Sequence, residues 1–136
     1  GRDSTTASMK SIPPALPALM RAQKIGKYAA KAGFDFPDAE SAFGKIHEET
    51  AEVAELIGGD DRDRLEEELG DLLFAVVNVC RKTGIDAEYA LGRANEKFLR
   101  RFSHVEDDVC ASGKKISDLE METLDSIWDW NKASER

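Results

Sequence analysis

Apolar residues recur at helical spacing in nearly every long segment of this 136-residue chain. Residues three, four and seven apart share one face of a helix, whereas a half-buried strand alternates at every second position. The spacing predicts helices at about residues 17–32, 39–57, 61–83 and 87–111, followed by a last helix that begins near residue 117. No segment has the period of a strand, and the connections are short. We therefore predict an all-α fold, built as an antiparallel helical bundle.

Polar residues that cap helices stand at the expected boundaries. Aspartates precede the second, third and fourth predicted helices: Asp38, Asp60 or Asp61, and Asp86. Ser117 and Glu120 have the spacing of a capping box for the last helix. The segment from Gly1 to Ser8 is small, polar and without pattern, and we interpret it as residues left by cloning. Met9 could then be the native start, and residues 9–136 would form a single helical domain.

The third predicted helix carries six consecutive apolar residues, from Leu72 to Val77. A helix that is apolar nearly all round is buried, so Asp71 and Asn78, which flank the run, are expected to be at least partly buried. The neighbouring helices offer too little apolar surface to cover such a helix. We therefore expect a homodimer, or a dimer of dimers, that completes the bundle by burying this helix at a subunit interface.

Composition narrows the classes of protein that fit. The net charge of −8 and the pI near 4.8 argue against a general nucleic-acid binder. No apolar run approaches the roughly 20 residues that span a bilayer, and no secretory signal is recognisable. The two cysteines, Cys80 and Cys110, do not make a disulfide framework. These features predict a cytoplasmic protein without a membrane or nucleic-acid partner.

Carboxylates gather on two adjacent predicted helices, at Glu48, Glu49 and Glu52 and again at Glu68 and Asp71. Residues three or four apart share a helix face, and the turn at residues 58–61 can bring the two acidic faces together. Most glutamate-rich helix faces are simply solvated. Several carboxylates in one cleft, however, repel each other unless protons or cations neutralise them. Oxygen-only ligands suit Mg²⁺ or Mn²⁺, so the pattern indicates a metal site between the two helices.

The order of these motifs resembles the MazG family of nucleoside triphosphate pyrophosphohydrolases. EExxE (Glu48 to Glu52) is followed by ExxD (Glu68 to Asp71), and the likeness continues in EEELGDLLFAVVN and RANEKFLRRFSHVE. The resemblance implies an all-α fold of that family, completed by dimerisation. It also implies Mg²⁺-dependent hydrolysis of a nucleoside triphosphate to the monophosphate and pyrophosphate, and a role in clearing surplus or damaged nucleotides.

The resemblance also implies roles for individual residues. Metal ligands would be Glu49, Glu52, Glu68 and Asp71. Glu48 and Glu49 are the candidate catalytic carboxylates, with Glu48 as a further ligand or as the base that activates water. Asn78 would contact the sugar or the base, Lys97, Arg101 and Lys132 would neutralise the phosphates, and Trp128 would close over the nucleotide. Lys97 and Arg101 lie four apart on one helix flank, where paired cations are either solvated or placed to contact phosphates.

The remaining motifs in the sequence do not predict a different kind of site. Phe34 and Phe36 lie in a turn and would pack on the core, although the resemblance leaves a base contact open for Phe36. His47 and His104 lack zinc-ligand spacing with the cysteines, and the pattern of a di-iron bundle is absent. No phosphate-binding glycine loop is present. The remaining alternative is a helical dimerisation or regulatory module that keeps the fold without catalysis.

Overall fold

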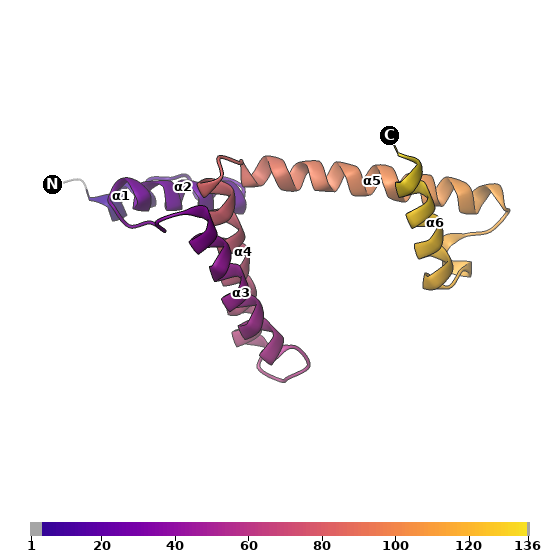
Figure 1. The fold of residues 1–136 in the computed structure, drawn as a ribbon, viewed down its shortest axis with the longest axis horizontal. Coiled ribbons are helices and arrows are strands. Elements are labelled where there is room, and N and C mark those ends of the chain that lie inside the picture. The colour runs from indigo at the N-terminus through magenta and orange to yellow at the C-terminus, as the bar shows by residue number, and fades with distance from the viewer. Residues whose placement is uncertain (1–3, 136) are drawn as a thin grey trace. The chain divides into compact units, whose positions relative to one another are not determined.

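A computed structural model describes residues 4–135, and every regular element in that range is helical (Figure 1). The elements follow in the order α1 (Thr5–Lys10), α2 (Ala18–Lys31), α3 (Ala39–Leu56), α4 (Arg62–Lys82), α5 (Ala87–Ala111), the short 3-10 helix η1 (Ile116–Asp118) and α6 (Met121–Ser134). The prediction of an all-α fold is confirmed. The boundaries of α2 to α5 fall close to the predicted ones, because apolar periodicity and polar caps both mark them.

The three predicted aspartate caps are present. A carboxylate oxygen accepts from a backbone N–H three residues on in each case: Asp38 from Ser41 (2.7 Å), Asp61 from Arg64 (3.1 Å) and Asp86 from Tyr89 (3.0 Å). The capping box at Ser117 and Glu120 is wrong. The 3-10 helix η1 occupies that stretch, Asp118 accepts from the Lys115 N–H at 2.9 Å, and α6 begins only at Met121.

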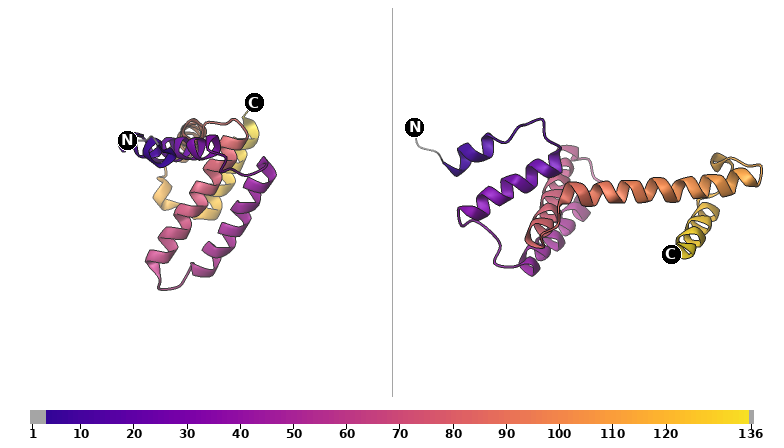
Figure 2. Two further views of the ribbon diagram at one scale, coloured as in Figure 1. Left: turned by 90° about the vertical axis from the view of Figure 1, so that its left-hand side faces the viewer. Right: turned by 90° about the horizontal axis from the view of Figure 1, so that it is seen from above.

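The chain divides into two compact units, Gly1–Ala90 and Leu91–Arg136. In the first unit α3 and α4 lie side by side and antiparallel, joined by the turn at residues 57–61 (Figure 2). Helix α2 packs on α4, and α1 packs on α2. Helix α1 covers Thr5 to Ser8, part of the segment interpreted as cloning residues, and Ser4 caps it; residues 1–3 of that segment lie outside the described range. The α3–α4 pair is the feature that positions the predicted site.

In the second unit, α6 packs against the later turns of α5. The rings of Phe98 and Trp128 lie 5.5 Å apart. Asn131 donates a hydrogen bond to Asp108 at 2.8 Å, and Val105 and Val109 are buried. These contacts fix α6 on one side of α5. No helix in the described residues has an apolar stretch long enough to cross a membrane.

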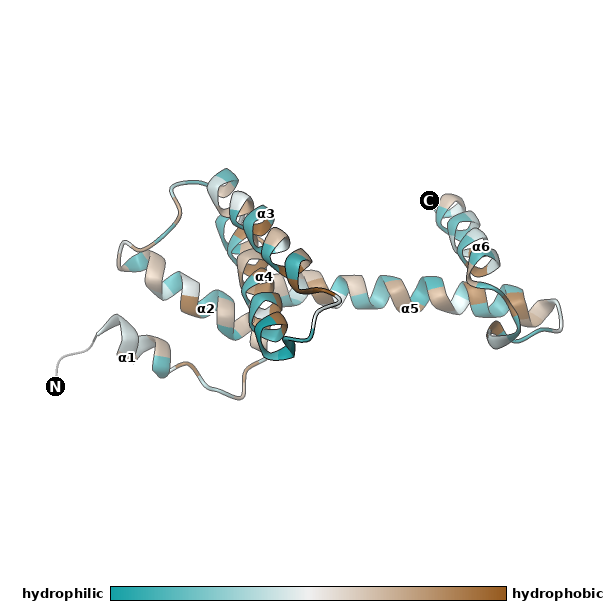
Figure 3. Ribbon diagram, turned by 90° about the horizontal axis from the view of Figure 1, so that it is seen from below, coloured by the Kyte–Doolittle hydropathy of each residue, from teal (hydrophilic) through white to brown (hydrophobic). Residues whose placement is uncertain are grey.

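In the single chain, other helices bury less of α4 than its apolar sequence predicts. Asn78 is buried, with 9% of its surface exposed, as expected. Asp71 is exposed, so the prediction of its burial is wrong. The helices that pack on α4 bury Ala75, Val77 and Asn78 in its second half and leave most of its first half open. Apolar segments therefore remain exposed between polar ones along α4 and α5 (Figure 3). Phe34 is 83% exposed, so the prediction that it packs on the core is wrong for the single chain.

Candidate metal centre

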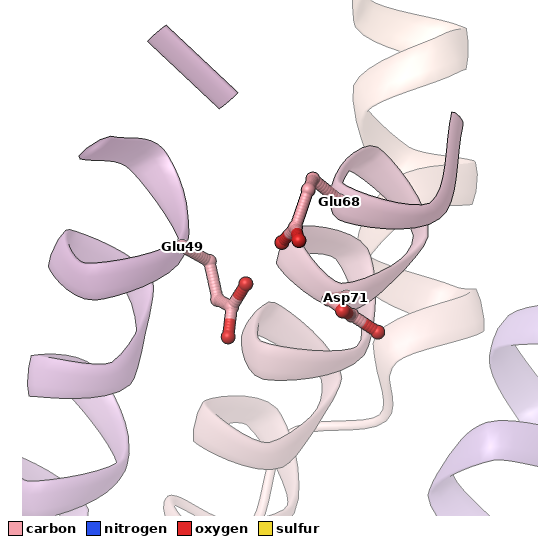
Figure 4. Close-up of side chains that lie close together, drawn as sticks. All are labelled: Glu49, Glu68 and Asp71. Atoms are coloured by element: carbon pink, nitrogen blue, oxygen red, sulfur yellow. The ribbon is translucent and has the colours of Figure 1, made fainter. Parts of the chain in front are cut away.

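Three carboxylates from α3 and α4 converge between the two helices. Glu49 comes from α3, and Glu68 and Asp71 come from α4, one turn apart. Each offers an oxygen, and these oxygens all lie within 4.8 Å of one another. Figure 4 shows Glu49 and Glu68 pointing toward each other from opposite helices. The antiparallel α3–α4 pair thus brings together carboxylates that are about 20 positions apart in the sequence.

The buried oxygens of this cluster are only partly satisfied. Glu49 is 5% exposed, and its Oε1 pairs with Lys45 Nζ at 3.1 Å. Glu49 Oε2 and Glu68 Oε2 are buried without a hydrogen-bond partner among the described residues. Burying an unpaired polar atom costs free energy. Two inward oxygens that lack a donor fit a hard divalent cation, which accepts oxygen ligands alone.

The negative charges of the clustered carboxylates repel each other. The pKa of Glu68 is raised to about 7, first by the neighbouring Glu52 carboxyl, then by burial, and then by Glu49. The ammonium of Lys45 has the opposite effect on Glu49 and lowers the pKa of that carboxyl. Without a metal ion to offset these charges, Glu68 is therefore about half protonated near pH 7, where an isolated glutamate is ionised.

The raised pKa predicts how stability depends on pH. Because Glu68 binds its proton more tightly folded than unfolded, the stability that it contributes is complete below about pH 4.5. That contribution is lost as the pH rises through the folded-state value of about 7. We expect the melting temperature of Glu68→Gln, measured in chelator, to exceed that of wild type by an increasing margin between pH 5 and pH 8. The exposed Glu67→Gln on the same helix is the control, and a margin that does not change with pH would contradict the prediction.

Two other predicted carboxylates lie beside the cluster rather than among its three convergent oxygens. Glu52 is half-buried, close enough to Glu49 and Glu68 to affect the pKa of each. The Glu48 side chain is 63% exposed and lies 3.6 Å from Lys45 Nζ. The lysine itself was not among the sequence candidates, although its place three and four residues before Glu48 and Glu49 on one helix is a usable signal.

The predicted phosphate-contacting residues lie in the second unit. Lys97 on α5 and Lys132 on α6 are exposed, and no carboxylate in the described range forms an ion pair with either. Arg101, in contrast, forms an ion pair with Glu135, in which its Nη2 lies 3.0 Å from Glu135 Oε2. This guanidinium lowers the pKa of the Glu135 carboxyl. Trp128 is half-buried against Phe98.

Asn78, the remaining predicted substrate contact, lies two turns beyond Asp71 on α4. Its side-chain oxygen accepts from Arg81, whose guanidinium in turn pairs with Asp35 at 2.6 Å. Neither Arg81 nor Asp35 was a sequence candidate. The two residues are 46 positions apart, so no local pattern connects them.

Comparison with known proteins agrees with this geometry. A family model described as the MazG nucleotide pyrophosphohydrolase domain matches residues 37–106, just over half of the chain. The chain is 45% identical over 131 residues to the nucleoside triphosphate pyrophosphohydrolase of Escherichia coli K12, which covers 95% of this chain and 50% of that protein. It is 40% identical over 124 residues to the nucleoside triphosphate pyrophosphohydrolase/pyrophosphatase MazG of Thermotoga maritima, covering 91% of this chain and 48% of that protein.

A shorter match, 43% identical over 72 residues, is to the uncharacterized protein YabN of Bacillus subtilis, of which it covers 15%. The chain spans about half the length of these two pyrophosphohydrolases. Both acidic motifs lie within the residues that the family model matches. The convergent carboxylates of α3 and α4, the all-helical fold and these matches together show that the chain belongs to the MazG nucleotide pyrophosphohydrolase family.

Proposed function

We propose that this domain hydrolyses a nucleoside or deoxynucleoside triphosphate to the monophosphate and pyrophosphate. The observation that carries the proposal is the group of three carboxylates whose oxygens lie within 4.8 Å of one another. Two of these side chains, Glu49 and Glu68, each have a buried oxygen without a hydrogen-bond partner among the described residues. The names of the two pyrophosphohydrolases that match most of the chain support the same activity. The physiological role would be the removal of surplus or damaged nucleotides.

The metal would be Mg²⁺, with Mn²⁺ as an alternative, held by Glu49, Glu52, Glu68 and Asp71. When bound, the cation supplies positive charge for phosphate oxygens and lowers the pKa of an attacking water. The carboxylates of the chain would hold and orient it, and Glu68 would have to be deprotonated to serve as a ligand, because a protonated carboxyl is a poor ligand. Glu48, whose side chain is 63% exposed, is the candidate that accepts the proton of the water.

Cationic side chains would balance the rest of the phosphate charge. Lys97 and Lys132 are exposed and available for an anionic ligand. Arg101 would have to exchange its ion pair with Glu135 for a phosphate oxygen, so its contribution to binding is expected to be smaller than that of Lys97. Trp128 would cover part of the nucleotide.

The direct test measures pyrophosphate release from a panel of standard, oxidised and deaminated triphosphates, with Mg²⁺ and with chelator. Metal-dependent release supports the proposal and identifies the preferred base and sugar. The alternative, a helical dimerisation or regulatory module without catalysis, predicts no release from any triphosphate under either condition.

The products of the reaction show which phosphoanhydride bond of the triphosphate is broken. We expect monophosphate plus pyrophosphate, formed by direct attack of water on the α-phosphorus without a covalent enzyme intermediate. In water labelled with ¹⁸O, the label should enter the monophosphate and not the pyrophosphate, as mass spectrometry can determine. Formation of diphosphate and orthophosphate would contradict the proposed reaction.

The functional assembly would be a homodimer or a dimer of dimers. On α4, Leu69, Leu73 and Val76 recur at positions i, i+4 and i+7, and all three are exposed in the single chain. At about 100° per residue, this stripe faces away from Asp71 and Asn78. Contiguous exposed apolar surface of this kind marks an interaction surface, and a second copy of α4 is the partner that we propose.

A further inference from the structure

One ion pair of the second unit has the geometry of a bound anion. Arg101 Nε donates to both carboxylate oxygens of Glu135 at 3.2 Å, and Arg101 Nη2 donates to Oε2 at 3.0 Å. Two adjacent N–H groups of a guanidinium bind a carboxylate and a phosphate in the same way. The Glu135 carboxylate therefore occupies the edge of Arg101 that a phosphate group would need.

Two further side chains of α5 add positive charge beside this carboxylate. Arg100 Nε lies 4.0 Å from Glu135 Oε1. The hydrogen bonds from Arg101 lower the pKa of the Glu135 carboxyl, and the charges of Arg100 and of protonated His104 act in the same direction. The Arg101 and Glu135 side chains are only 16% and 26% exposed, so water screens their attraction less than it screens an open surface pair. Arg100, Arg101 and His104 thus form one anion site on α5, which Glu135 fills.

Polar contacts tie the end of α6 to α5. Asn131 donates a hydrogen bond to Asp108 at 2.8 Å, and Glu135 pairs with Arg101 one turn later. The three residues between Asn131 and Glu135 are exposed, and Glu135 lies just past the helix as its C-cap. A carboxylate at the C-terminal end of a helix is disfavoured by the helix dipole. Glu135 therefore owes its place to Arg101 rather than to a preference of the helix.

We propose that Glu135 is an intramolecular competitor of the substrate, whose carboxylate occupies the α5 anion site until the phosphates of a triphosphate displace it. The inference rests on the proposed function, which assigns Arg101 to the phosphates. A site that is open in only a fraction of the molecules has an apparent affinity reduced by that fraction. Glu135 therefore lowers the affinity of the free protein for triphosphates. By returning to Arg101 after hydrolysis, it also opposes retention of the products.

The kinetic test replaces the competing charge and keeps the size of the side chain. Glu135→Gln should lower KM for a triphosphate by about fivefold, the size expected for one partly exposed ion pair. The value of kcat should not change, because at saturation the carboxylate has left Arg101 in every molecule. Glu135→Ala should lower KM at least as much. Asp129→Asn removes an exposed negative charge of the same helix and should leave KM unchanged, which controls for net charge.

A double-mutant cycle assigns the effect to the Arg101–Glu135 pair. Arg101→Gln should raise KM, because a phosphate contact is lost. In that background Glu135→Gln should change KM by less than about twofold, since the carboxylate no longer competes for the donors of Arg101. A fivefold fall in KM that persists without Arg101 would reject Glu135 as a competitor for this guanidinium.

A binding measurement separates failure of this inference from failure of the proposed function. Inorganic tripolyphosphate is titrated in chelator by calorimetry, and the Arg101 Nε–H resonance, identified by its loss in Arg101→Lys, is followed by NMR. We expect Glu135→Gln to bind about fivefold more tightly than wild type and Asp129→Asn, and tripolyphosphate to shift the resonance in both wild type and Glu135→Gln. This result in a protein that hydrolyses no triphosphate would retain the competitor and reject the activity. Hydrolysis with the same KM in wild type and Glu135→Gln would overturn the inference, and so would equal or undetectable binding of tripolyphosphate by the two proteins.

Discussion

Asp71→Ala and Glu52→Gln are each expected to reduce metal-dependent hydrolysis by roughly 100-fold or more. Asp71 supplies one of the three convergent oxygens, and Glu52 lies beside the other two carboxylates. Groups that only support a metal ligand typically change affinity or activity by about 10–100-fold, so loss of a ligand should cost at least as much. Pyrophosphate release at saturating Mg²⁺ measures the effect. Glu55→Gln on α3 and Glu67→Gln on α4 remove charges at exposed positions of the same two helices and should retain full activity.

The same substitutions should act on stability in the opposite direction. In chelator the clustered carboxylates repel each other, so removal of one charge should leave the melting temperature unchanged or raise it. Mg²⁺ should raise the melting temperature of wild type more than that of Asp71→Ala, because only a native state that binds the ion gains from it. If Asp71→Ala melted well below wild type in chelator and kept near-normal turnover, the carboxylates would be structural and the proposed site would be wrong.

Leu73→Asp is expected to convert the proposed dimer into a monomer. Leu73 is 59% exposed in the single chain and lies at the centre of the stripe formed with Leu69 and Val76. A buried charge without a partner at a subunit interface is strongly unfavourable, whereas the same charge in a monomer is solvated. Light scattering at micromolar concentration measures the change in mass.

Ile57→Asp provides the control for this substitution. Ile57 follows α3 and is 68% exposed, but it lies outside the α4 stripe. The control should keep the wild-type mass. A wild-type protein that is a stable monomer at micromolar concentration would contradict the predicted interface, and so would a Leu73→Asp variant that remains associated.

The sequence by itself determined the helices and most of their ends. Periodicity and capping are local properties, because they depend on residues within a few turns of each other, and Asp38, Asp61 and Asp86 cap as predicted. The start of the last helix was left open by the sequence: the Ser117–Glu120 spacing fits a capping box, whereas the family resemblance places the start slightly later, and in the structure a short 3-10 turn capped by Asp118 occupies that stretch. The acidic motifs were likewise recognisable from their order along the chain.

Only the tertiary structure decided which of these residues meet. The antiparallel α3–α4 pair selects Glu49, Glu68 and Asp71 from the acidic positions, and the neighbouring Glu52 carboxyl, burial and Glu49 together raise the pKa of Glu68. A sequence pattern gives the face on which a carboxylate lies, but not its distance from a carboxylate on another helix. The contact between Asp35 and Arg81 spans 46 positions and has no local signature. Its consequence, the orientation of the Asn78 amide, depends on three-dimensional placement alone, since either end of an amide is compatible with the same sequence.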